Sequence, residues 1–582
     1  MEQDAKLKKY SLYLGESFFV SAALIIQLEI KESIWQILLF ILAFAFIQYT
    51  KGFPDSKKAG MLLSIFLSFT LILGKCYYIN ESILSFWKEP VKLGIILLGN
   101  ALLIMRSLNW GIGRWRNITE KEWTCGFSKW IFGKKCFYKI GMILLVLWSP
   151  VIVLSFPGNI SADAVRQIEQ VLGIVSYSGH HPLFSTLLIG GSIKAGHMLF
   201  GSYDIALFVY IWLQSTALAF TLAATVCTLK ERRSSHLVLL CLLSVYVFAP
   251  VYSNITSTVI KDVPFMIAVI WYIMLWAELC TDFKILKNTR FLLMFFVTQI
   301  LVVLLRNNGI YMLLISHILF FFIRYRDMIT QKIMKKSLFM LFLPIIMGVC
   351  VNSFLFNTLN AHSGSRREML SLPFQQTARY VLQYEDEITA EEKEIIDAIL
   401  TDTISIARNY DPNIADPVKV LYRDQASIGE HIQYFKIWVK WFFRHPQVYF
   451  DAFFAHVYGW FCPLIPNEIR YEAESDIFAI KELFPGSDKM LVDFYRRLDG
   501  IAPLGLLENV GIYTWMLFIL SSLIWKKDRR RITIFIPLHV SLLICMLSPC
   551  FFLQPRYAFP IMFTIPFLMG FLSPGLEIDT KA

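Results

Sequence analysis

Residues 156–182 read FPGNISADAVRQIEQVLGIVSYSGHHP, and the rest of the chain is organised around this stretch. Its polar and ionisable side chains interrupt an apolar sequence, because one membrane-length apolar run ends at its start and another begins at about Asp204. Polar groups are costly in lipid, so they should lie just outside the membrane or line a cavity within it. We therefore predict a functional loop between two membrane helices.

The composition is that of a membrane protein. The 582 residues are 56% hydrophobic and only 17% charged, a balance that soluble domains rarely show. The net charge of +11 comes from basic loops, whereas residues 358–508 are acidic. This pattern fits a cytoplasmic membrane face, so no nucleic-acid partner is expected. The ten cysteines show neither a disulfide framework nor the spacing of a metal site.

About 14 apolar runs reach the length that spans a bilayer, so the predicted fold class is an α-helical polytopic membrane protein. The runs lie near 11–29, 33–50, 60–78, 91–105, 138–156, 204–229, 234–252, 258–280, 289–305, 309–324, 337–357, 509–525, 532–550 and 556–573. They divide the chain into a four-helix N-terminal region with a basic loop (1–137), a membrane module (138–357), a mainly α polar domain (358–508) and a three-helix C-terminal region (509–582).

The distribution of Lys and Arg predicts the orientation of the helices. With the N-terminus inside, alternation places these basic loops on the cytoplasmic face: 51–58, 106–135, 230–233, 282–290, 324–336 and 526–531. The remaining connections then fall outside: 157–203, 252–257, 306–308, 358–508 and 551–555. The sequence therefore predicts that both termini are cytoplasmic and that the polar domain is extracytoplasmic.

Charged and polar side chains gather on the predicted outer face, at the mouths of otherwise apolar helices. Such residues are functional candidates in membrane proteins, because placing them there is costly. They are Asp163, Gln167, His180 and His181 in the first outer loop, Lys261 and Asp262 at the start of a helix, Arg306 and Asn307 in a short turn, Arg366 and Arg367 at the start of the polar domain, and Arg556 and Tyr557 at the last helix.

Asp163 is the candidate catalytic residue, in the role of a general base. A carboxylate in a partly dry cavity can take a proton from an attacking hydroxyl or amine. Ser161 is expected to cap a helix that carries Asp163 and Gln167, which are four residues apart and so share one helical face. The alternative is that Asp163 is only a first-turn acid that the helix dipole favours.

The adjacent His180 and His181 are a less specific signal. Neighbouring residues do not share a helical face, so both could bind one metal only if the chain turned at Pro182. The alternative is that they are interfacial histidines that pack at the end of a loop.

The arginines suit a phosphate group, because a guanidinium is always charged and binds phosphate oxygens in a bidentate manner. Arg306, Arg366, Arg367 and Arg556 all fall on the predicted outer face. Taken singly, each is explained as well by anchoring at the membrane interface. The sequence contains no GxGxxG, Walker A or HExxH motif, which argues against a nucleotide-fuelled pump and a zinc protease.

The layout resembles the seven-helix module of the GT-C glycosyltransferases: a helix, an outer loop with an acid, further helices and a long outer domain. The motifs PGNISADAVRQ, YSGHHPLFSTLL, RNNG (306–309), LPFQQTARYV (372–381) and YDPNIADPVK (410–419) also resemble a bacterial family of GT-C-like proteins, over most of the chain after about residue 138. That resemblance does not itself supply an activity. The motif LPFQQTARYV adds Gln375, Gln376 and Arg379 to the substrate-binding candidates.

The resemblance implies a substrate class. GT-C enzymes take a sugar from a polyprenyl-phosphate or polyprenyl-diphosphate donor on the non-cytoplasmic face, and the essential acid of their first outer loop corresponds here to Asp163. Many also use a second acid and a divalent metal such as Mg²⁺ or Mn²⁺. Asp262 is the nearest second acid, but Lys261 beside it disfavours a metal, so metal dependence is left open.

These observations together predict a membrane glycosyltransferase of the bacterial plasma membrane. Its partners would be a lipid-linked sugar donor, an envelope glycan or lipid acceptor, and membrane lipids. One alternative is a transporter or flippase of lipid-linked glycans. Transporters often place charged groups at mid-membrane in broken helices, whereas the charged groups of this sequence gather at the outer ends of helices. The other alternative is a non-catalytic scaffold, in which Asp163 would be dispensable.

Overall fold

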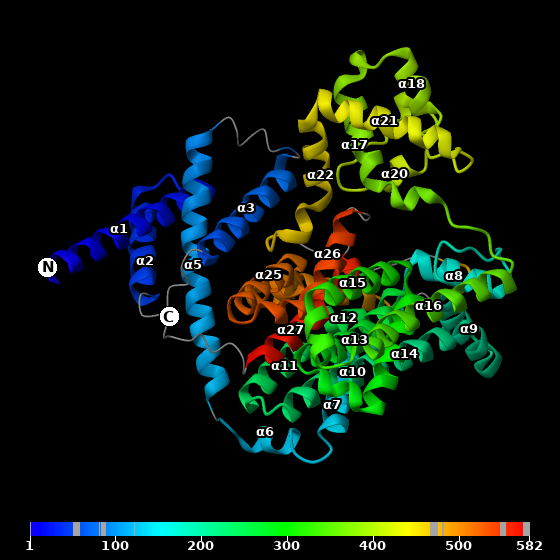
Figure 1. Cartoon of the computed structure of the whole chain (residues 1–582), viewed down its shortest axis with the longest axis horizontal. Helices are drawn as coiled ribbons and strands as arrows, with labels where there is room; N and C mark the ends of the chain where they lie inside the picture. Colours follow the sequence, from blue (N-terminus) through cyan, green and yellow to red (C-terminus); the bar gives the residue numbers. More distant parts are fainter. Residues whose placement is uncertain are drawn as a thin grey trace.

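The computed structural model describes residues 2–50, 59–80, 82, 89–121, 123–465, 475–479, 482–547 and 555–573. These residues are almost wholly α-helical (Figure 1). The predicted loop 51–58 and nearly all of the predicted loop 551–555 lie outside the described residues.

The elements follow the chain in four groups. The first group is α1 (Glu2–Gln27), α2 (Ser33–Thr50), α3 (Ala59–Asn80), α5 (Pro90–Glu120) and α6 (Gly126–Ile131). The second is α7 (Cys136–Leu154), β1 (Asn159–Ile160), α8 (Ala162–Leu172), α9 (Leu183–Phe200), α10 (Tyr203–Glu231), α11 (His236–Phe248), α12 (Pro250–Thr256), β2 (Thr258–Val259), α13 (Asp262–Thr281), η1 (Phe283–Lys287), α14 (Thr289–Leu305), α15 (Asn307–Thr330) and α16 (Met334–Thr358). The third is η2 (Arg366–Met369), α17 (Ser371–Tyr384), η3 (Glu385–Glu387), α18 (Ala390–Asp397), α19 (Thr403–Arg408), α20 (Asp416–Lys419), α21 (Ile428–Arg444), α22 (Pro446–Phe461), α23 (Ser487–Asp499) and α24 (Ala502–Glu508). The fourth is α25 (Val510–Lys527), η4 (Arg529–Phe535), α26 (Ile536–Leu547), η5 (Pro555–Ala558) and α27 (Phe559–Leu572).

Among the described residues, 11 helices are long and apolar enough to cross a membrane, or 12 if the bent pair α11–α12 forms one span. The chain is therefore a multi-pass membrane protein, with fewer candidate spans than the 14 predicted. The predicted runs at 11–29, 289–305 and 509–525 are helical but are not among these spans, and α14 has only 17 residues.

Helix α9 is a candidate span that was not among the predicted membrane helices. It lies inside the segment 157–203, which was predicted as an outer loop, yet it is an 18-residue apolar helix and a candidate span. Its sequence contains Gly190, Gly191 and Gly196, which lower its apparent hydrophobicity. Two of these glycines serve packing, because a Cβ at Gly190 would meet Val171 and a Cβ at Gly196 would meet Ala206. The hairpin of α9 and α10 is thus closely packed.

The main hydrophobic core is centred on α13 and α27. In these two spans, 72% and 83% of the residues are buried, compared with 17% in α2. Both helices are apolar on all sides, which is typical of helices at the centre of a membrane bundle. They hold the last helix of the chain against the module that follows α7, so residues near position 556 lie close to residues near position 261.

Two smaller cores flank the main one. Helices α1, α2 and α5 share a core that includes Val20, Ile47 and Leu102, and this unit stands to one side of the bundle (Figure 1). A third core lies within residues 374–449 and joins α17, α21 and the start of α22. Helix α22 then continues into the main core. Among its described residues, the predicted domain 358–508 therefore has a core of its own only in its first part, whereas α22 and α24 pack with the membrane helices.

Candidate functional site

A short parallel ladder brings two distant loops together. Strand β1 pairs with β2, with Asn159 opposite Thr258, so the chain enters α8 and α13 at the same place. Asp163 lies in the first turn of α8, and Lys261 immediately precedes α13. The register of the ladder therefore sets these two side chains opposite each other.

The turn before α8 depends on a glycine and on a cap. Gly158 has a φ of +131°, and a Cβ at this position would lie 1.9 Å from Cδ1 of Ile211, so only glycine fits there. Ser161 is the N-cap of α8, as predicted, because its Oγ accepts a hydrogen bond from the Ala164 N–H at 3.2 Å. The Gly158 turn and the Ser161 cap thus fix the backbone that leads to Asp163.

Three side chains contact the Asp163 carboxylate. Lys261 Nζ donates to Asp163 Oδ2 at 2.8 Å, and Arg556 Nη1 donates to the same oxygen at 3.2 Å. The Lys261 ammonium also donates to His181 Nδ1 at 2.7 Å. Since Nδ1 must then accept, neutral His181 carries its proton on Nε2, which lies 3.8 Å from Asp163 Oδ1. The cluster therefore joins α8, the loop after α8, α13 and the last helix.

Electrostatics fix the protonation states of this cluster. Burial alone would raise the pKa of Asp163, but the charges of Lys261 and Arg556 outweigh it and hold this pKa well below its usual range. Burial and the nearby Lys261 charge lower the pKa of His181 to about 3, and burial also lowers the pKa of His180. Near neutral pH, Asp163 is consequently a carboxylate and His181 is uncharged.

A second ion pair lies beside the first. Arg306 Nη1 is 2.6 Å from Asp262 Oδ1, and both side chains are buried. The Arg306 guanidinium lies 4.5 Å from the centre of the Tyr557 ring, and the Arg556 guanidinium lies 5.0 Å from the same centre. Tyr557 is thus in cation–π contact with both arginines, and Arg556 Nη2 donates to its hydroxyl at 3.3 Å.

These contacts connect six residues, which we call the charge ring: Asp163, Lys261, Asp262, Arg306, Tyr557 and Arg556. Lys261 and Asp262 are joined as neighbours in the chain. Three cations and two carboxylates leave it with one net positive charge. A surplus cation on partly buried groups attracts an anion, and guanidinium groups pair well with phosphate oxygens. The side chain of Asp163 is 27% exposed, so the ring is accessible from solvent at this point.

A groove of about 510 Å³ is lined in part by His181, whose Nδ1 accepts a hydrogen bond from Lys261 of the charge ring. Its lining includes Asn307 at the start of α15 and Asn352 and Asn357 near the end of α16. Asn307 Nδ2 also donates to the His180 carbonyl at 3.3 Å, which ties the groove to the loop after α8. Carboxamide side chains present both donors and acceptors, so the groove is suited to a ligand that carries several hydroxyl groups.

A protein-family model matches residues 175–573, more than half of the chain, and its description is a family of unknown function (DUF6020). The chain belongs to DUF6020. No curated protein and no solved structure matches it. The part that defines DUF6020 contains every member of the charge ring except Asp163, which lies before the matched segment.

In this DUF6020 chain, Gln167 serves packing and does not join the charge ring. Its Nε2 donates to Ser185 Oγ at 2.9 Å and to Thr186 Oγ1 at 3.2 Å, and the residue is fully buried. It therefore links α8 to α9. As predicted, Asp163 and Gln167 share one face of α8. At Asp163 this face meets Lys261 and Arg556, whereas one turn later, at Gln167, it meets α9.

Arg366 and Arg367 lie in η2, and Arg367 contacts a partner outside the charge ring. Arg367 Nε donates to Glu368 Oε1 at 3.3 Å, and Lys419 Nζ donates to Glu368 Oε2 at 2.8 Å. His180 lies between the two clusters, because the charges of Glu368 and Lys261 both influence its pKa. The backbone continues this link, since the Gly179 N–H donates to the His362 carbonyl at 2.7 Å.

The LPFQQTARYV motif is a structural element of the third core. Gln375 Nε2 donates to the Asp411 carbonyl, and Gln376 Nε2 donates to the Tyr449 carbonyl. Arg379 Nη2 lies 3.6 Å from Asp451 Oδ2. All three motif residues are buried and bind neighbouring helices, so the structure places them away from Asp163.

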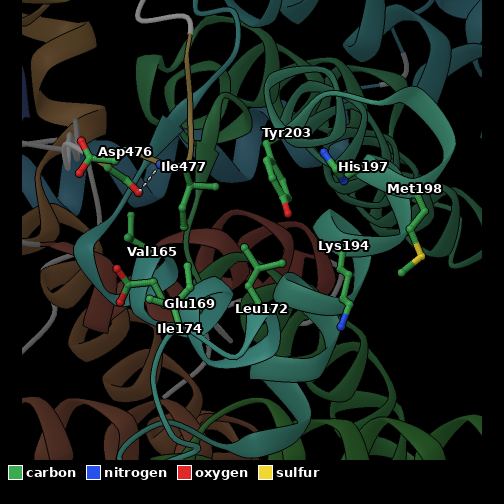
Figure 2. Close-up of a pocket in the computed structure, with 11 residues that line it drawn as sticks. Val165, Glu169, Leu172, Ile174, Lys194, His197, Met198, Tyr203, Asp476 and Ile477 are labelled. Atoms are coloured by element: carbon green, nitrogen blue, oxygen red, sulfur yellow. Dashed lines mark hydrogen bonds between the residues drawn. The ribbon is translucent and has the colours of Figure 1, made fainter.

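A separate cavity of about 820 Å³ lies between α8, α9 and residues 475–477 (Figure 2). The α8 side chains that line it are Val165, Glu169 and Leu172. These positions lie on the face of α8 opposite Asp163, given 100° per residue. We therefore assign the candidate site to the charge ring and its groove rather than to this cavity.

The carboxylates do not form a metal site in the part of the chain that the structure describes. No group of three or more His, Cys, Asp or Glu side chains gathers there. Asp163 and Asp262, the two acids considered for a divalent cation, are each paired with a cationic side chain. The arrangement does not fit Mg²⁺ or Mn²⁺, which would have to displace Lys261, Arg306 or Arg556.

The groove residues Asn352 and Asn357 were not among the sequence candidates. They lie in VNSFLFNTLN at residues 351–360, where polar amides interrupt the end of an apolar run. That interruption is the same signal that singled out Asp163. The pattern of apolar residues alone predicts only the end of a membrane helix at this position.

Proposed function

We propose that this protein is an integral membrane glycosyltransferase of the GT-C type. It would move a sugar from a polyprenyl-phosphate-linked donor to a cell-envelope glycan or lipid on the extracytoplasmic face. The observation that carries the proposal is the Asp163 carboxylate held between Lys261 and Arg556, with His181 joining this cluster to a groove that asparagines line. A base, two phosphate-binding cations and a sugar-sized groove are the parts that such a transfer needs.

In the proposed step, a hydroxyl of the acceptor loses its proton to Asp163. The acceptor oxygen forms a bond to the anomeric carbon of the donor sugar, and the bond between that carbon and the phosphate oxygen breaks. The electron pair leaves with the polyprenyl phosphate, whose developing charge Lys261 and Arg556 stabilise. Arg306, held over Tyr557, adds positive charge on the same side.

The resting ion pairs give the donor a role in activating the base. While Lys261 and Arg556 hold Asp163, its low pKa makes it a weak proton acceptor. A donor phosphate that takes over both cations would release Asp163 and raise its pKa. The base would then become effective only when the donor is bound, which limits unproductive hydrolysis.

The remaining parts of the proposal concern placement. The GT-C-like module would comprise residues 138–357, with Asp163 in the position of the essential acid. The segment 358–508 would lie on the extracytoplasmic side and help to form the acceptor site, because its start at His362 pairs with the loop that carries His180. The asparagine-lined groove would hold the sugar or the acceptor hydroxyls.

The test is sugar transfer from defined polyprenyl-phosphate sugars by purified protein. Asp163→Asn keeps the volume of the side chain but removes the base, so transfer should fall by roughly 10²–10⁴-fold. Glu169→Gln is the matched control, since it also neutralises one acid of α8 but on the opposite face. We expect this control to keep near-normal activity.

Two results would count against the proposal. An Asp163→Asn variant that transfers sugar as well as wild-type protein would remove the base from the mechanism. Wild-type protein that transfers no sugar, yet moves labelled lipid-linked glycan across liposomes, would identify a transporter instead.

A further inference from the structure

A groove of about 490 Å³ lies at the junction between the N-terminal helices and the main bundle, with no charge-ring residue in its lining. Its walls come from the second half of α5, the turn between α10 and α11, and the helices α25 and α27. The volume is within the usual range of small-ligand sites, roughly 300–1,000 Å³. Its basic turn, residues 230–233, belongs to the face that the charge distribution predicts to be cytoplasmic.

One end of this groove is polar and contains groups that lack a partner. Trp115 Nε1 and Ser234 Oγ are both buried, and neither has a hydrogen-bond partner within the described ranges. Arg233 is exposed beside them. The one acid in the lining, Glu120, is neutralised by Arg116 at 2.6 Å. Buried donors without partners are costly, so this end favours a ligand with acceptor oxygens and negative charge.

The other end is apolar and is lined by side chains such as Leu108, Ile112, Leu520 and Leu523. Helix α5 packs chiefly against α1 and α3 and makes only a small contact with the bundle through α11. In Figure 1, α5 accordingly stands at the edge of the bundle. The groove thus lies between the second half of α5 and the helices α25 and α27, and its lining combines a polar part with an apolar part.

We propose that this groove binds an anionic phospholipid. The phosphate would accept hydrogen bonds from Trp115 and Ser234 and pair with Arg233, and an acyl chain would fill the apolar part between α5 and α25. Basic pockets between helices near the cytoplasmic surface are recurrent sites for anionic lipid headgroups, because that leaflet carries the negative lipids. The bound lipid would add a contact between α5 and α25 to those that α3 already makes with α22 and α25.

Gly111 offers a clean way to test the site. It lines the groove, and a Cβ added there meets no atom within 4 Å, so a leucine side chain can start at this position and extend into the groove. Gly94, on the same helix, also has open space but lies outside the groove, so Gly94→Leu is the matched control. Both changes replace glycine in a helix and should improve helix propensity equally.

The measurement is native mass spectrometry of the purified full-length protein, titrated with phosphatidylglycerol and, separately, with phosphatidylcholine and polyprenyl phosphate. We expect wild-type protein and Gly94→Leu to retain phosphatidylglycerol, and Gly111→Leu to lose it. Arg233→Gln should weaken retention about fivefold, the contribution of one arginine near an anionic lipid. Arg290→Gln, an exposed arginine on the same predicted face, should leave it unchanged.

Three outcomes would overturn the proposal. The first is equal retention of phosphatidylglycerol by wild-type protein and Gly111→Leu. The second is tighter retention of phosphatidylcholine or polyprenyl phosphate than of phosphatidylglycerol. The third is a chain ending at Ser573 that retains more lipid than the full chain, because residues 574–582 would then be the occupant of the groove. None of these results depends on glycosyltransferase activity.

Discussion

Arg556 is the residue at which the proposed donor chemistry can be tested most sharply. Within the described residues its guanidinium donates from Nη1 to Asp163 at 3.2 Å and from Nη2 to the Tyr557 hydroxyl at 3.3 Å. A donor phosphate that took the place of the Asp163 carboxylate would bind the same two nitrogens of the planar guanidinium group. Arg556→Lys keeps the charge but offers a single ammonium, so one of the two directed bonds is lost.

The size of the effect follows from that lost bond. A hydrogen bond to a charged group contributes about 1.5–3 kcal/mol, which corresponds to roughly 10- to 150-fold weaker donor binding. Sugar transfer should be measured with the donor titrated at fixed acceptor. We expect the KM for the donor to rise by that factor in Arg556→Lys, and Arg556→Ala to be worse because it also removes the charge.

Two comparisons separate a phosphate contact from a general effect on folding. Arg306→Lys should raise the donor KM in the same way if both arginines bind one phosphate, because Arg306 contacts the same Tyr557 ring as Arg556. Arg290→Lys, remote from the ring, should leave it unchanged. If Arg556→Lys has the donor dependence of the wild-type protein, Arg556 serves only to anchor the last helix, and the reasoning fails.

Three further predictions concern charge and topology. Lys261→Gln removes the strongest lowering influence on the pKa of Asp163, so the acid limb of the pH–rate profile should move to higher pH than in the wild-type protein. The pKa of His181 is about 3 in the folded protein and ordinarily about 6.5, so the unfolded chain binds the extra proton first and stability should be lost as pH falls from about 6.5 towards 3. In thermal unfolding at several pH values, His181→Gln should lose less stability with falling pH than the wild-type protein, by up to about 1.4 kcal/mol per pH unit. A cysteine at exposed Glu391 should react with an impermeant thiol reagent added outside, whereas one at Arg529 should not, and equal labelling would reject the orientation.

Local signals predicted much of the architecture. Apolar runs identified most of the helices, and Ser161 was recognised as the cap of α8 because capping depends on a few neighbouring residues. Helix α9 was missed because its glycines, which allow close contact with Val171 and Ala206, dilute the apolar signal. The helix still qualifies as a candidate span by length and mean hydropathy, so the segment was recognisable from the sequence.

The candidate site was likewise predictable only in part. Placing polar residues at the mouths of apolar helices brought Asp163, Lys261, Arg306 and Arg556 onto one list, and the structure gathers them into one ring. Their pairing was not predictable, since it depends on the β1–β2 register and on the last helix packing against α13. Gln167 was assigned to the site because helical spacing gives a shared face but not the neighbour that the face meets.

The most direct test of the central claim is the balance of products from purified protein supplied with a polyprenyl-phosphate sugar and an acceptor. The proposed step releases one free polyprenyl phosphate for every sugar that joins the acceptor. Mass spectrometry of both products should therefore show equal amounts, with both lost together in Asp163→Asn. Donor that remains intact while envelope acceptors stay unmodified, across a range of lipid-linked sugars, would contradict the claim that the charge ring catalyses glycosyl transfer.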